Sequence, residues 1–189
     1  TGRLSHLAGN ILLLSKIEHQ AIQTRQNWYR LDEQIRQSIV MLEPKWSEKE
    51  LEFDVDMVDV EYLGNENLIC HVWDNLLSNA IKFSPCGGTI YIRMMPEGEK
   101  IRFSIENEGP QISEDSMKHI FDKFYQGDTS HATYGNGLGL ALVKRVLELT
   151  DGHITVKSKP QKGTTFTVFM PIAEKVMDMQ QDRTENETV

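Results

Sequence analysis

The alternation of apolar and polar residues is clearest between residues 68 and 85, where it predicts an amphipathic helix. Apolar residues recur every three or four positions and form one broad stripe. Beside the stripe, His71, Asn75, Asn79 and Lys82 fall within an arc of about 80°. Two amides one turn apart suit a hard cation held through oxygen, and a lysine one turn further suits a phosphate. A solvated polar face gives the same pattern, so this stretch alone leaves both interpretations open.

Within this helix the projection also predicts which apolar residues face the core. The stripe comprises Val72, Trp73, Leu76, Leu77, Ala80 and Phe83. Leu68 falls inside the polar arc, and Ile81 lies outside the stripe with Asp74 and Ser78. The sequence therefore predicts that Leu68 and Ile81 are not part of the core-facing stripe.

The rest of the chain alternates predicted helices with predicted strands. We expect helices over residues 4–23, 32–46, 113–121 and 137–150, and strands over 28–31, 51–57, 60–63, 89–95, 100–107, 153–158 and 164–170. Residues 96–99 should form a hairpin turn, and residues 126–136, which contain almost no aliphatic side chain, a mobile loop. Antiparallel pairs beside segregated helices predict a two-layer α/β sandwich, with one mixed, mostly antiparallel sheet and helices on one face.

The first predicted helix carries an apolar stripe that it cannot bury alone. Its members include Leu4, Leu7, Ile11, Leu14 and Ile17. Such a stripe predicts association with another helix or another chain. We therefore divide the chain into residues 1–26, the end of a dimerisation helix, residues 27–173, one globular domain, and residues 174–189, a polar and disordered tail.

Composition narrows the functional classes. The chain has 189 residues, a net charge of −8 and a pI of about 5.3, which argues against a nucleic-acid-binding surface. Its two cysteines, Cys70 and Cys86, lie at opposite ends of the 68–85 helix and have neither metal-ligand spacing nor the density of a disulfide scaffold. No apolar run approaches the roughly 20 residues that span a bilayer. We expect a cytoplasmic location and no membrane contact.

Three further clusters follow the amide-bearing helix. Residues 105–112 end a strand in a sharp turn, residues 121–125 are aromatic and cationic, and residues 135–140 run glycines into a helix N-terminus. Such a glycine-rich segment lets backbone N–H groups approach anionic oxygens, aided by the helix dipole. Glycine-rich turns alone are a weak signal, and the sequence contains no P-loop, dinucleotide or protein Ser/Thr kinase motif.

The four clusters, in this order and spacing, resemble the N, G1, F and G2 boxes of sensor histidine kinases. Residues 163–166 are similar to the last glycine motif of that family, and residues 1–23 to the second helix of its dimerisation domain. The resemblance covers about residues 28–172 and implies the Bergerat ATP-binding fold, shared with the ATPase domain of gyrase. It also implies ATP and Mg²⁺ as ligands.

The resemblance assigns roles to individual residues. It implies that Asn79 binds Mg²⁺, that Asn75 completes the same motif with His71 as an accessory polar contact, and that residues 126–136 form the ATP lid. Asn75, Asn79 and Lys82 are the expected catalytic residues, Lys82 by contacting phosphate. The remaining residues expected at the ATP site are Phe83, Asn107, Gly109, Gln111, Ile112, Phe121, Phe124, Tyr125, Gly135, Gly137, Leu138, Gly139, Leu140 and Thr165.

Two departures from the family pattern bear on function. Asn107 stands where the family usually has an aspartate that reads the adenine amino group, and Gln111 replaces a glycine. An asparagine can accept a hydrogen bond from that amino group through its oxygen and donate one to a ring nitrogen, so Asn107 can still recognise adenine. The alternative is that this replacement weakens the nucleotide site. None of the six histidines has the context of the family's phosphoacceptor, which places the acceptor outside this chain.

The sequence therefore predicts the catalytic ATP-binding part of a bacterial sensor histidine kinase. It would transfer the ATP γ-phosphoryl group to a histidine of the dimerisation domain, for relay to a response regulator. The resemblance also implies a homodimer in the full-length protein. Two alternatives are a pseudokinase that signals through nucleotide binding, and an ATP-driven conformational domain like that of gyrase.

Overall fold

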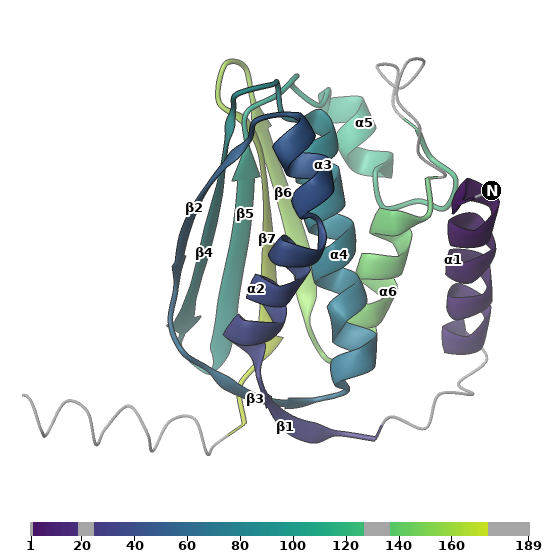
Figure 1. The fold of residues 1–189 in the computed structure, drawn as a ribbon. Coiled ribbons are helices and arrows are strands. Elements are labelled where there is room, and N and C mark those ends of the chain that lie inside the picture. Colours follow the sequence, from purple (N-terminus) through teal and green to yellow (C-terminus); the bar gives the residue numbers. More distant parts are fainter. Residues whose placement is uncertain (1, 19–24, 127–136, 174–189) are drawn as a thin grey trace, which may run out of the picture.

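The computed structural model describes residues 2–18, 25–126 and 137–173. Within them, a five-stranded sheet carries helices on one face, and a two-stranded sheet lies at one end (Figure 1). The helices are α1 (Gly2–Glu18), α2 (Leu31–Met41), α3 (Glu43–Glu48), α4 (Glu66–Phe83), α5 (Glu114–His119) and α6 (Gly139–Leu149). The strands are β1 (Asn27–Arg30), β2 (Glu52–Met57), β3 (Glu61–Gly64), β4 (Thr89–Glu97), β5 (Lys100–Asn107), β6 (His153–Lys159) and β7 (Gly163–Pro171). The predicted two-layer α/β sandwich is confirmed.

The large sheet is mixed and mostly antiparallel, as predicted. Its strand order is β2-β4-β5-β7-β6, and β2 runs parallel to β4 while the other neighbours are antiparallel. The hairpin predicted at residues 96–99 joins β4 to β5, and the strands predicted over 153–158 and 164–170 form the β6–β7 hairpin. The short strands β1 and β3 pair with each other instead of joining the large sheet.

Helix α4 occupies the centre of the helical layer (Figure 1). The side chain of Asn65 caps its first turn by accepting from the backbone N–H of Leu68 at 3.0 Å. Contrary to the projection, Leu68 and Ile81 are buried, with exposed fractions of 3% and 4%. The reason is that α4 contacts α2, α6 and the sheet together, so its buried face is wider than one stripe.

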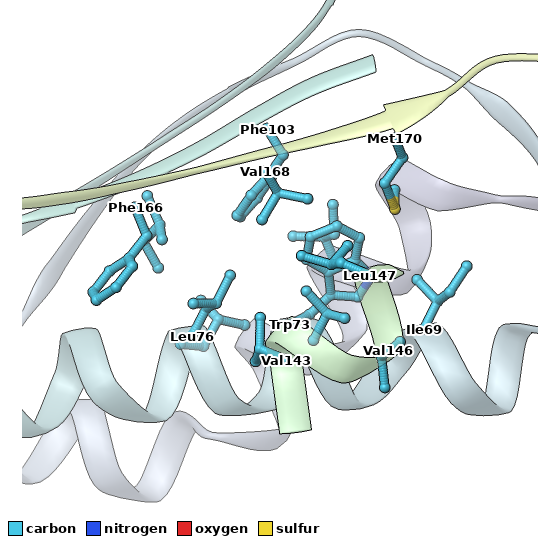
Figure 2. Packing of buried hydrophobic residues seen from close by; sticks show 14 of the residues in the cluster. Ile69, Trp73, Leu76, Phe103, Val143, Val146, Leu147, Phe166, Val168 and Met170 are labelled. Carbon is cyan, nitrogen blue, oxygen red and sulfur yellow. The ribbon is translucent and has the colours of Figure 1, made fainter. Parts of the chain in front are cut away.

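The core fills the space between α4, α6 and the sheet. Figure 2 shows Trp73 of α4 close to Leu147 of α6, with Phe103 and Val168 on the strands above. The rings of Trp73 and Phe103 lie 4.7 Å apart, and both are fully buried. The indole N–H of Trp73 donates to Gln34 Oε1 at 2.8 Å, so this large side chain is buried without an unpaired polar atom.

The predicted helix over 32–46 is two helices. The first of them, α2, begins at Leu31 and ends at Met41. Helix α3 follows, with Pro44 in its first turn. A proline inside one continuous helix would remove a hydrogen bond and clash with the preceding turn, so the helix restarts there. Asp32 is also a helix N-cap candidate by sequence, but the N-cap is Arg30, and the buried Asp32 carboxylate accepts from Arg30 at 2.7 Å and from the backbone N–H of Val60 at 3.2 Å.

Helix α1 lies beside α6 (Figure 1) and buries part of its apolar stripe there. Leu14 and Ile17 are 5% and 1% exposed, so this part of the stripe associates with another helix, as predicted, and that helix belongs to the same chain. Ile11 and Leu12 remain 45% and 60% exposed. Among the described residues, no helix combines the length and apolar character needed to cross a bilayer.

Candidate nucleotide site

The polar strip of α4 is present as predicted. His71, Asn75, Asn79 and Lys82 are all half-buried, beside the residues that α4 buries. The Asn75 amide nitrogen donates to the backbone carbonyl of His71 at 2.7 Å, which leaves its Oδ1 turned toward the start of α6. The helix thus presents amides and a cation along one accessible face.

The N-terminus of α6 comes directly against this strip. A Cβ added to Gly139 would lie 2.6 Å from Asn75 Oδ1, so a larger residue at this position would displace the Asn75 amide. The preceding residue, Leu138, is buried and provides no side-chain cap for the first turn. The N–H groups that begin a helix lack intrahelical partners and favour anions. Amide side chains and an anion-binding helix end therefore meet at one place.

Lys82 and Phe83 lie at the C-terminal end of α4. The Lys82 ammonium is 4.7 Å from the centre of the Phe83 ring, and burial lowers the pKa of Lys82. Beneath them, Lys49 Nζ donates to the carbonyl oxygens of Ile81, Lys82 and Ser84 at 2.9, 2.8 and 2.8 Å. No local pattern in the sequence indicates Lys49, which is more than 30 residues away and donates only to backbone atoms there.

The end of β5 packs against the same end of α4. Asn107 is 5% exposed, and its amide nitrogen donates to the carbonyl of Glu108 at 3.0 Å. A Cβ on Gly109 would lie 2.6 Å from the carbonyl oxygen of Phe83, so this turn also requires glycine. The predicted G1 and N boxes are thus in direct contact.

The two residues that follow in the G1 box are placed differently from each other. Gln111 is exposed. The backbone N–H of Ile112 donates to Ser158 Oγ at 2.9 Å, and that hydroxyl lies 3.0 Å from Thr164 Oγ1. The β6–β7 hairpin therefore fixes the position of the G1 turn.

The aromatic cluster joins the beginning of α6 through its backbone. The N–H of Phe124 donates to the carbonyl of Gly137 at 2.8 Å, and both residues have positive φ angles, of 63° and 67°. Phe121 packs edge-on to Phe166 with ring centres 6.4 Å apart, as a core residue would. A core position that anchors the lid is the alternative role for the aromatic residues of this cluster, and it is wrong for Phe124, which is 64% exposed. Tyr125 is held by its hydroxyl, which donates to Ser116 at 3.0 Å.

Thr165 is the one described candidate that lies away from the site. It pairs with Glu106 and donates to that carboxylate at 3.0 Å, on the face of the sheet opposite the helices. Its neighbour Thr164 is buried on the helical side, in register with Asn107. Leu140 is half-buried in the first turn of α6. Gly135 and most of the predicted lid, residues 127–136, lie outside the described residues.

The amide side chains of α4, the N-terminus of α6 and the end of β5 meet on the helical side of the sheet, and the fold is that of an ATP-binding domain. Residues 64–174 match the model of the histidine kinase-, DNA gyrase B- and HSP90-like ATPase family. This match covers more than half of the chain, which therefore belongs to that family. The chain is an ATP-binding catalytic domain of the histidine kinase type.

Two curated relatives share about a third of their aligned residues with this chain. The heme sensor protein HssS of Staphylococcus saprophyticus is 35% identical over 168 residues, which are 89% of this chain and 36% of HssS. The circadian input-output histidine kinase CikA of Synechococcus elongatus is 37% identical over 177 residues, covering 89% of this chain and 23% of CikA. The chain thus spans about a third or less of these relatives.

Solved structures show the same fold. Full-length ShkA in complex with AMPPNP has a TM-score of 0.79 at 25% identity, covering 90% of this chain and 36% of ShkA. The histidine kinase ThkA, solved with the response regulator protein TrrA, has a TM-score of 0.73 at 24% identity, covering 93% of this chain and 50% of ThkA. The latter similarity concerns the fold alone.

Proposed function

We propose that this chain binds Mg-ATP and transfers the γ-phosphoryl group to a histidine located outside residues 1–189. The observation that carries the proposal is the close approach of Gly139 to Asn75, which brings the N-terminus of α6 to the amide strip of α4. A triphosphate with its metal ion requires such a combination of positive helix end, amide oxygen and lysine. These residues therefore fit Mg-ATP.

Within this proposal each group has a physical task. Asn79 would hold Mg²⁺ with Asn75 beside it, and Lys82 would contact phosphate. When bound, Mg²⁺ neutralises phosphate charge. The backbone of Gly137 to Gly139 would hold the phosphates, and Asn107, at the buried end of β5, would read adenine. Catalysis would consist of positioning and charge neutralisation, and the phosphoryl group would pass from ATP to the acceptor histidine with no covalent intermediate on this chain.

The remaining expected site residues divide by placement. Gly109, Ile112, Phe121 and Tyr125 support the walls of the site, and Leu138 and Leu140 flank Gly139. Gln111 and Phe124 are exposed at its edge. We infer that Thr164, which faces the helices, contributes to the site in place of Thr165.

The proposal extends to the full-length protein. We infer that residues 1–26 end a dimerisation helix, that residues 27–173 form the ATP-binding unit, and that residues 174–189 do not belong to the site. The partners would be the dimerisation and phosphoacceptor domain in a homodimer, and a receiver domain as in the complex of ThkA with TrrA. The chain would work on the cytoplasmic side of a membrane-anchored sensor.

Phosphotransfer to a supplied acceptor tests this proposal. The chain is mixed with the dimerisation domain of its own full-length protein and with Mg-ATP labelled at the γ-phosphate. We expect acid-labile label on the supplied domain and negligible label on the chain itself. Nucleotide binding without transfer would identify a pseudokinase, and acid-labile label on His6 would show that the acceptor lies within the chain.

A further inference from the structure

One cluster of metal-ligand side chains on α4 lies beside the nucleotide strip. Cys70, His71 and Asp74 each offer one ligand atom, and these three atoms lie within 4.8 Å of one another. All three residues are half-buried. Their spacing explains the convergence, because on a helix the position of Asp74 lies between those of Cys70 and His71. Cys86, at the far end of α4, takes no part.

The chemistry of this cluster is that of a borderline-soft divalent cation. Thiolate, imidazole and carboxylate are the groups that bind Zn²⁺, at about 2.0–2.3 Å in tetrahedral geometry. Ligand atoms in such a site are about 3.3–3.8 Å apart, from those bond lengths. Binding would require the three side chains to draw these atoms together from separations of up to 4.8 Å.

The surrounding charge also favours a cation. The carboxylates of Asp74 and Glu66 lie one turn to either side of Cys70 and create a negative potential around it. The same negative potential attracts a divalent cation. Cys70 Sγ lies 3.1 Å from the backbone carbonyl of Asn67, which holds the sulfur at the surface of its own helix.

We propose that Cys70, His71 and Asp74 form a Zn²⁺ site, with a fourth position open to water. On binding, the Cys70 S–H bond breaks, its proton passes to solvent, and the sulfur coordinates the metal ion with both bonding electrons. No oxidant or reductant is involved.

This site would regulate the nucleotide site through His71. The imidazole belongs to both groups, and the backbone carbonyl of His71 accepts the hydrogen bond that orients Asn75. Coordination of Zn²⁺ would withdraw the imidazole from the polar strip, so a bound nucleotide would lose the accessory polar contact expected of His71. We therefore infer that Zn²⁺ lowers the affinity for ATP. This second part rests on the proposed function.

Titration of the whole chain with Co²⁺, in the absence of nucleotide, tests the metal site directly. Co²⁺ takes the geometry of Zn²⁺, and its thiolate complexes have a near-ultraviolet charge-transfer band. We expect that band at one equivalent in the wild-type chain and in Cys86→Ser, and its displacement by Zn²⁺. Cys70→Ser should lose the band, and Asp74→Asn should weaken Co²⁺ binding about tenfold or more. Circular dichroism checks that both variants remain folded.

The result that overturns the site is the absence of the band in the wild-type chain, its retention in Cys70→Ser, or its loss in Cys86→Ser. The regulatory part is tested by titrating AMPPNP with and without Zn²⁺. We expect weaker binding with Zn²⁺ in the wild-type chain and no change in Cys70→Ser. Equal effects in both proteins would overturn the regulation. Failure of AMPPNP to bind without Zn²⁺ would instead contradict the proposed function and leave the Co²⁺ result standing.

Discussion

Replacing Lys49 by methionine should destabilise the domain and weaken nucleotide binding, because Lys49 caps the C-terminal end of α4. Its ammonium group donates to three carbonyl oxygens in the last turn, including those of Lys82 and Ser84. A helix leaves its final carbonyls without intrahelical partners, and a cation there also interacts favourably with the helix dipole. Methionine keeps the apolar stem of the side chain but provides no donor.

The size of the effect follows from these contacts. A hydrogen bond from a charged donor contributes about 1.5–3 kcal/mol, and a cation at a helix C-terminus about 0.3–1 kcal/mol. In Lys49→Met, water can donate to some of these carbonyl oxygens, because position 49 is only half-buried, so the loss is smaller than the sum of three hydrogen bonds. We therefore expect the free energy of unfolding to fall by about 2–4 kcal/mol, which lowers the Tm of a domain of this size by roughly 5–15 °C.

Urea denaturation and AMPPNP titration measure the two consequences. Lys45→Met is the matched control, because Lys45 is exposed on α3 and its replacement should change neither quantity. Lys49→Arg should recover part of the stability, since a guanidinium group also donates and carries charge. A Lys49→Met protein as stable as Lys45→Met would refute the role that we assign to Lys49.

Three further substitutions test separate parts of the structure. Gly139→Ala should weaken AMPPNP binding about tenfold, because its Cβ would lie 2.6 Å from Asn75 Oδ1 of α4. Gly9→Ala is the control and should leave the affinity unchanged, because a Cβ there meets nothing within 4 Å. Equal AMPPNP affinities of the two variants would be incompatible with a close approach of α6 to α4. Asp32→Asn should lower stability at neutral pH. Burial raises the pKa of Asp32, but its hydrogen bonds outweigh burial and hold the pKa below the usual 3.8, so the wild-type advantage is present above that pH and disappears as the pH falls through the folded-state pKa. A difference in unfolding free energy between the wild-type chain and Asp32→Asn that stays constant across the pH series would contradict this. Phe121→Ala should lower the free energy of unfolding by about 1–3 kcal/mol, about half the loss for a fully buried phenylalanine, because Phe121 packs on Phe166. Phe124→Ala should change it almost not at all, because Phe124 is exposed. Comparable losses for the two variants in urea denaturation would contradict the exposure of Phe124.

Local periodicity predicted most of the elements. The α4 strip follows from the helical period, and both hairpins follow from alternation bounded by turn residues. Thr165 could have been excluded on the same ground, because Phe166, Val168 and Met170 are the core positions of β7 and the alternation places Thr164 with them. Pro44 likewise gave a signal for the break between α2 and α3.

Tertiary contacts account for what the sequence could not provide. The burial of Leu68 and Ile81 depends on the three neighbours of α4, and the burial of Ile17 depends on α6. Lys49 reaches α4 only because the turn before β2 lies against the end of that helix, where Gly87 donates to the Lys49 carbonyl at 2.9 Å. No spacing within α4 itself indicates a lysine supplied from another segment.

The central claim is that Mg-ATP binds along α4 with Asn79 holding the metal ion. Calorimetric titration with AMPPNP, in the presence and absence of Mg²⁺, tests this claim most directly. We expect one site, strengthened by Mg²⁺ in the wild-type chain and in the control Ser78→Ala, and at least roughly tenfold weaker in Asn79→Ala when Mg²⁺ is present. Wild-type affinity and undiminished Mg²⁺ dependence in Asn79→Ala would contradict the account.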